Sequence, residues 1–205
     1  MEFLKNIRLI QGGMGVFVSN WRLARAVAMQ RPGITAGTVS GTALDVVYTR
    51  MLQLGDPGGH IQRAFAAFDS YFDTHVGKRI IERFYIKGGK EPSVRFKNSP
   101  MHHLRTIDGN DLFLESKAQT EPVNLILDQE NIELIVAATF AEVWLAKEGH
   151  SGKIFVNFLN KIELPLIYGM YGAMLAGVDG IVVGAGNPEG LPELCTHLSQ
   201  HRSVN

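Results

Sequence analysis

The chain has 205 residues, of which 45% are apolar, and its 20 basic residues balance its 20 acidic ones. This length suits one domain with a core of its own, and the charge balance disfavours a large electrostatic surface for nucleic acid or anionic lipid. The single cysteine, Cys195, excludes an intrachain disulfide and a cysteine-rich zinc site. No signal-peptide pattern and no membrane-length apolar run is visible, so we expect a soluble, cytoplasmic protein that binds neither nucleic acid nor membrane.

The N-terminal residues predict a strand followed by a helix. The apolar run 7–11 stops at Gly12-Gly13-Met14-Gly15, which is typical of a buried strand that ends in a glycine turn. Ser19 or Asn20 then caps a helix with apolar residues on one face, and Pro32-Gly33 ends it.

A second strand and helix follow. Residues 34–39 predict a short strand that ends at Ser40-Gly41. Thr42 and Asp45 have the spacing of a capping box for the next helix. This alternation of strands and helices favours the α/β class with parallel strands.

The middle of the chain is less regular. Residues 59–68 and 74–85 carry apolar residues at helical spacing. The segment 87–131 is polar and contains glycines and prolines, so we expect an insertion or a lid there. No repeat or linker divides the chain, and residues 1–205 are predicted to form a single α/β domain.

Alternation returns after this segment. Residues 133–148 begin with a strand-like run and end with a helical one, which Gly149 closes. The elements predicted next are a strand, a helix and a strand, at 153–159, 165–178 and 181–184. Asn187 is the expected cap of a last helix that has Pro188 at its first position.

Small or polar residues follow or end these four strands. They are Gly13, Ser40, Gly41, Asn157, Gly184 and Gly186. Parallel α/β folds bind ligands at the carboxyl ends of their strands, so these positions are the candidate site.

The glycine turn at 12–15 has two interpretations. A backbone without Cβ atoms lets a flat ring or a phosphate approach closely, but a tight turn between strand and helix also explains it. It is neither a dinucleotide fingerprint nor a Walker loop, because position 18 is not glycine and no Gly-Lys-Ser/Thr follows.

Asn157 also has two interpretations. Asparagine is uncommon in strands, and a buried amide needs hydrogen-bond partners. Either a bound ligand or the neighbouring backbone supplies them.

The histidines and Ser40 form no recognisable catalytic motif. His197 and His201 stand four residues apart but lack the H-E-x-x-H pattern, and no metal site is predicted. His60 either faces the site or begins a helix. Ser40 lacks the G-x-S-x-G elbow of a hydrolase, because positions 38 and 42 are both threonine.

Several blocks, in this order, resemble the nitronate monooxygenase family, formerly called 2-nitropropane dioxygenases. They are IQGGMGVFVSNWRLARAVA, VSGTALD, LGDPGGH, FAEVWLAKEGHSG, VNFLNKIELP and YGAMLAGVDGIVVGAGNPEGLPELC. The resemblance is strong across 7–60 and 135–195 and loose across the polar segment between them.

The resemblance implies an FMN-dependent oxidoreductase on a (β/α)8 TIM barrel. Such enzymes oxidise alkyl nitronates or nitroalkanes with dioxygen to a carbonyl compound and nitrite, with FMN across the carboxyl ends of the strands. The matching positions imply the cofactor-binding residues Gly12, Gly13, Met14, Ser40, Gly41, Asn157, Gly184 and Gly186. Thr139 stands where an asparagine is expected in the family.

The chain departs from the family in its extent. A complete barrel takes ~250 residues and eight strands, whereas only about four βα units are predicted here. The A-G-G-H segment that carries the family's catalytic histidine has no match, and neither do the later glycine-rich phosphate loops. We therefore expect the N-terminal half of a barrel, which associates with itself or with a complementary C-terminal half.

Two alternatives remain open from the sequence. One is an enoyl reductase of the polyunsaturated fatty acid or polyketide synthase type, which uses FMN and NADPH on the same barrel. The other is a non-catalytic half-barrel fragment that only associates with a partner chain.

Overall fold

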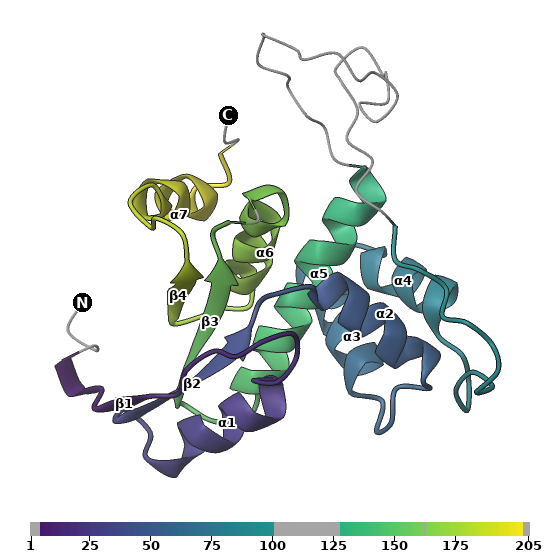
Figure 1. The fold of residues 1–205 in the computed structure, drawn as a ribbon, viewed down its shortest axis with the longest axis horizontal. Coiled ribbons are helices and arrows are strands. Elements are labelled where there is room, and N and C mark those ends of the chain that lie inside the picture. The colour runs from purple at the N-terminus through teal and green to yellow at the C-terminus, as the bar shows by residue number, and fades with distance from the viewer. Residues whose placement is uncertain (1–4, 101–127, 162, 203–205) are drawn as a thin grey trace, which may run out of the picture.

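A computed structural model describes residues 5–100, 128–161 and 163–202 of the chain. They form four strands and seven helices in an α/β arrangement (Figure 1). In this described part, no helix is both long enough and apolar enough to cross a membrane. Residues 101–127, most of the expected insertion or lid, lie outside the described residues.

One parallel sheet carries all four strands. They are β1 (Leu9–Ile10), β2 (Thr35–Ser40), β3 (Lys153–Leu159) and β4 (Gly180–Ala185). Their order in the sheet is the order in the chain, and the sheet is curled. The four predicted strands and their parallel pairing are confirmed. The first strand was predicted to be buried, but β1 is shorter than predicted and exposed, because it lies at the edge of the sheet.

Three of the described helices pack on one face of the sheet, and three more pack against the far side of one of them. They are α1 (Trp21–Gln30), α2 (Leu44–Gln53), α3 (His60–Phe72), α4 (Val76–Phe84), α5 (Gln129–Lys147), α6 (Glu163–Leu175) and α7 (Leu191–Ser199). Helices α1, α5 and α6 contact the sheet, and α2, α3 and α4 pack on the other side of α5. Figure 1 shows α5 running between the strands and these three helices.

Glycines set the close spacing of these layers. A Cβ atom on Gly37 of β2 would lie 1.9 Å from the carbonyl oxygen of Ala24 in α1. A Cβ on Gly172 of α6 would lie 2.3 Å from the carbonyl oxygen of Val136 in α5. These contacts are backbone to backbone, so only glycine permits them.

The strand-like start predicted for residues 133–148 is wrong, because the whole segment belongs to α5. This helix has 19 residues, and the Asp128 carboxylate caps it by accepting a hydrogen bond from the Glu130 amide. Residues 134–143 are all buried, since the sheet covers one side of the helix and other helices cover the opposite side. A helix that is apolar all round has no periodicity to separate it from a buried strand.

Two predicted helix starts are also corrected. Asn20 caps α1 as expected, but α2 has no capping box at Thr42 and Asp45. It begins at Leu44, after Ala43 in the left-handed conformation with φ of 54°. Helix α7 begins three residues later than predicted, after Gly190, and Asn187 instead accepts a hydrogen bond from an amide in the preceding turn.

The described start of the polar segment is tied to α2. The Gln53 side chain donates to the carbonyl oxygen of Lys97 and accepts from its amide, at 2.9 and 2.7 Å. The Lys90 amide donates to the Gln53 carbonyl oxygen at 2.8 Å. Residues 87–100 therefore pack on the body of the protein.

Candidate functional site

The carboxyl edge of the sheet brings three of the predicted residues together around Asn157. A Cβ atom on Gly13 would lie 2.2 Å from the Cβ of Asn157, and one on Gly184 would lie 3.2 Å from its Oδ1. Ser40 pairs with Asn157 across β2 and β3. Segments from the start, middle and end of the chain thus meet at one side chain.

Asn157 is 9% exposed, and its side-chain amide makes no hydrogen bond to any described residue. Its backbone oxygen accepts from the Gly41 amide at 2.8 Å. Of the two interpretations of Asn157, a partner on the neighbouring backbone is not found within the described ranges. The amide offers donors and an acceptor at the edge where parallel sheets bind ligands.

Ser40 has a structural role in this arrangement. It is buried, its hydroxyl donates to the Gly15 carbonyl oxygen, and its amide donates to the Ser19 carbonyl oxygen at 2.8 Å. The Ser19 hydroxyl accepts from the Met14 amide at 2.9 Å. These bonds fix the loop after β1 against the end of β2.

The outer part of that loop is open. A Cβ on Gly12 would meet no atom within 4 Å, and Met14 is 61% exposed. The close contact with Asn157 explains why residue 13 is glycine, and this contact needs no bound ligand. Gly12 and Met14 leave an accessible surface beside Asn157.

Gly41 and Gly186 are needed by the chain itself. A Cβ on Gly41 would lie 2.3 Å from the ring of Phe158, and one on Gly186 would lie 2.7 Å from the Cβ of Asn160. Gly186 also has φ of 104°, which side chains rarely adopt. These two glycines therefore carry no information about a ligand.

Thr38 joins the same face of the sheet, because alternate residues of a strand share a face. It is fully buried two residues before Ser40, and its Oγ1 has no hydrogen-bond partner in the described structure. The Gln11 side chain bonds to the Thr38 backbone instead, at 3.1 and 3.3 Å. Thr38 was not among the predicted residues, although a threonine inside a buried strand indicates such a position.

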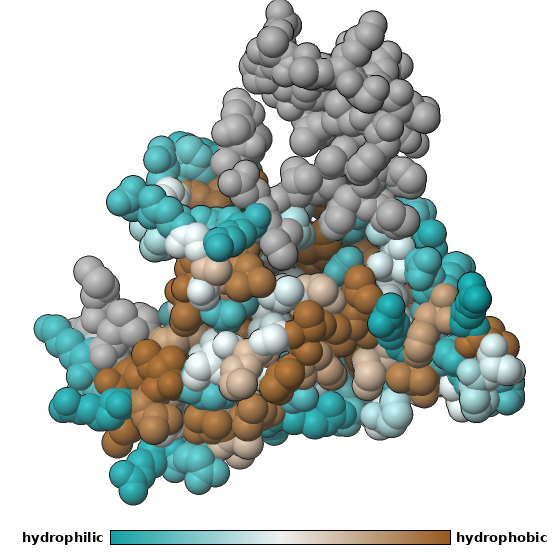
Figure 2. All heavy atoms as spheres, in the orientation of Figure 1, coloured by the Kyte–Doolittle hydropathy of each residue, from teal (hydrophilic) through white to brown (hydrophobic). Residues whose placement is uncertain are grey.

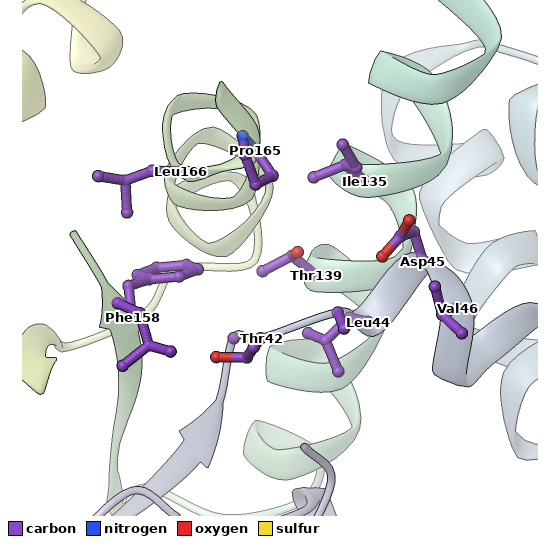
Figure 3. A pocket seen from close by; sticks show the side chains of 12 residues that line it. Thr42, Leu44, Asp45, Val46, Ile135, Thr139, Phe158, Pro165 and Leu166 are labelled. Carbon is purple, nitrogen blue, oxygen red and sulfur yellow. The ribbon is translucent and has the colours of Figure 1, made fainter. Parts of the chain in front are cut away.

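A separate pocket opens on the opposite face, where Phe158 points away from Asn157. It has a volume of about 200 Å³ and lies between the ends of β2 and β3, the start of α2, and helices α5 and α6 (Figure 3). We name it the Thr139 pocket; its lining residues are Gly41, Thr42, Ala43, Leu44, Asp45, Val46, Ile135, Thr139, Phe158, Leu159, Pro165 and Leu166. Thr139 therefore lines a pocket from a helix and does not end a strand.

A buried acid lies deeper among the helices. Glu142 of α5 is fully buried, and the Tyr48 hydroxyl of α2 donates to its Oε2 at 2.6 Å. Burial raises the pKa of Glu142 to about 7, although the Tyr48 hydrogen bond, the Trp21 amide and the Arg22 charge act in the opposite direction. Burial also raises the pKa of Tyr48 well above its ordinary value. A glutamate inside an apolar helical segment is the sequence signal for this pair.

His60 and His201 contact residues other than those around Asn157. His60 is the first residue of α3, and its ring packs beside Trp21 with centroids 5.0 Å apart. The His201 Nδ1 lies 2.9 Å from the Tyr171 hydroxyl. Within the described residues, no group of three or more potential ligands is placed to hold a metal ion.

No family model matches this chain, and no curated protein or solved structure matches it either.

Proposed function

We propose that this chain is the N-terminal half of an FMN-dependent oxidoreductase that acts on alkyl nitronates or nitroalkanes. One observation carries the proposal: the Asn157 amide lies without a hydrogen-bond partner, in the described structure, at the carboxyl edge of the sheet. Gly184, a further residue that the resemblance implies for cofactor binding, lies beside Asn157, and the Gly13 backbone packs against it.

The topology supports a partial (β/α)8 barrel. Barrel strands follow one another in chain order, run parallel and keep their helices on the outer face. The four strands have this order, and α1, α5 and α6 contact one face of the curled sheet. The other face carries Asn157 and is the interior of the proposed barrel.

Some of the residues at this edge of the sheet fit a flat cofactor that forms hydrogen bonds, and others are explained without it. The Asn157 amide would bond to the polar edge of the FMN ring, and the loop at Gly12 would lie against the ring, since no atom fills that space. The hydroxyl of Thr38 is a further unsatisfied group on the same face. Gly13, Gly41 and Gly186 are explained by packing within the chain, so they add nothing to the fit.

When bound, FMN would supply the redox chemistry that converts a nitronate and dioxygen to a carbonyl compound and nitrite. The residues of this chain would bind and orient the ring. The resemblance places the base for neutral nitroalkanes on a segment that has no match in this sequence, so in this proposal a complementary half supplies it. We therefore propose flavin binding by this half and turnover only after association.

An exposed apolar surface is available for the proposed association with a second chain. Leu9, Ile10, Met14, Val16 and Val18 are all more than half exposed, on β1 and the loop after it. Figure 2 shows hydrophobic surface in the region where Figure 1 places β1. β1 is also an edge strand of the sheet, so backbone groups there are available for pairing. A second copy or a complementary half would cover this surface.

A titration of the chain with FMN, followed by flavin fluorescence, tests the proposal. Asn157→Leu keeps the branched shape of the side chain and removes its amide. We expect this variant to bind FMN about three- to tenfold more weakly, because the loss of one hydrogen bond has about this effect. The matched control is Asn98→Leu at an exposed position, and its affinity should equal that of the wild type. Equal affinities for wild type and Asn157→Leu would show that Asn157 holds no flavin.

A further inference from the structure

The Thr139 pocket lies outside the site proposed above. Phe158 lines it, whereas Asn157 points to the opposite face of the same strand. Gly41 and Gly169 bring the backbones of β2 and α6 close to the Phe158 ring and fix its position. The pocket is thus built between the sheet and its helices, and β3 separates it from Asn157.

Most of the pocket wall is apolar, and one buried hydroxyl faces into it. Thr139 is only 1% exposed, lines the pocket, and makes no hydrogen bond to any described residue. A threonine in a helix commonly satisfies its hydroxyl on the carbonyl oxygen four residues earlier, and this bond is not made here. Figure 3 shows the Thr139 side chain in the space between Phe158, Pro165 and Ile135.

The start of α2 supplies the second polar feature. Its first residues line the pocket, and Ala43 before them provides no side-chain cap. The first amides of a helix have no partner within the helix itself, so they favour a group that accepts hydrogen bonds. The rest of the lining is mostly apolar, and an ionised group would lose its hydration there. The pocket therefore suits a neutral acceptor.

Its volume sets the size of the occupant. An apolar cavity of about 150 Å³ accepts benzene, which has six non-hydrogen atoms. By the same ratio of volume to atoms, the Thr139 pocket, at about 200 Å³, accepts a molecule of about eight non-hydrogen atoms.

We propose that the Thr139 pocket binds a neutral molecule with a short apolar chain and one hydrogen-bond-accepting oxygen, of the class of medium-chain ketones. The oxygen accepts from the Thr139 hydroxyl, and the chain lies against Phe158 and Leu166. This binding depends on the ends of β2 and β3, the start of α2, and helices α5 and α6, and it stands whether or not the protein binds FMN.

Titration of the full chain with heptan-2-one, followed by NMR of its methyl groups, tests the proposal. We expect saturable shifts of the Ile135 and Leu166 methyl signals. Thr139→Val keeps the shape, removes the hydroxyl, and should weaken binding about three- to tenfold. Thr196→Val is the control, because it removes a threonine hydroxyl at an exposed position of α7, outside both proposed sites. It should bind as the wild type does.

Heptanoate should bind more weakly than heptan-2-one, because its ionised carboxylate would lose hydration in a mostly apolar pocket. Three results would overturn the proposal: no saturable shift at Ile135 and Leu166, equal affinity for wild type and Thr139→Val, or shifts confined to Ile181 and Leu191. The last result would place the ligand in the wider cavity between β4 and α7.

Discussion

The buried pair Glu142 and Tyr48 should make the stability of this protein fall as the pH rises. Glu142 of α5 has no exposed surface, its Oε2 accepts from Tyr48, and its Oε1 has no partner in the described structure. The ionised form is therefore poorly solvated, which is why burial raises the pKa of Glu142 from 4.5 to about 7.

The pH window and the magnitude follow from these two pKa values. Below pH 4.5 both the folded and the unfolded chain hold the proton, and no free energy is lost. Between pH 4.5 and 7 only the unfolded chain releases it, so stability declines with rising pH. The full loss above pH 7 is about 3 kcal/mol, at 1.36 kcal/mol for each pH unit between the two pKa values.

Urea unfolding of the wild type and Glu142→Gln at pH 5.5 and pH 8 measures this effect. The glutamine is neutral at both pH values, so the variant should gain about 2 kcal/mol relative to wild type between them, the part of the loss that falls between pH 5.5 and pH 7. Glu82→Gln, at an exposed position of α4, is the control and should follow the wild type. Parallel pH profiles for wild type and Glu142→Gln would refute the assignment of a buried, protonated Glu142.

Two further predictions concern stability elsewhere in the fold. Partial burial would raise the pKa of Asp179, but hydrogen bonds from a β3 amide, Lys147 and Lys153 outweigh it and lower the pKa. The stabilisation is present at neutral pH and lost in acid, so Asp179→Asn should lose about 1 kcal/mol at pH 7 by urea unfolding and little below pH 3. Gly37→Ala places a methyl group 1.9 Å from a carbonyl oxygen of α1 and should destabilise by about 1–3 kcal/mol. Thermal unfolding of Gly12→Ala, where a Cβ meets no atom, should be near wild type, and equal melting temperatures for the two variants would contradict the close-packing argument.

The sheet could be predicted because each strand has a local signature. Residues 153–159 are an apolar run with breakers on both sides, and β3 has these bounds. The small residues at 12–13, 40–41 and 184 mark the strand ends, and parallel pairing then places them at one edge. The meeting of Gly13 and Gly184 at Asn157 follows from that pairing.

The helical part could not be predicted to the same degree, for two physical reasons. Helix α5 is buried on all sides, so its apolar residues show no period that distinguishes it from a strand. The start of α2 depends on a left-handed Ala43, which no side-chain propensity indicates. The Thr139 pocket joins three distant segments of the chain, so it exists only in the packed structure.

The visible absorption spectrum of the purified chain, after incubation with FMN and desalting, tests the central proposal most directly. We predict retained bands near ~370 and ~450 nm, as for a bound flavin. A chain that emerges colourless would contradict the proposal that this half binds FMN through the edge around Asn157.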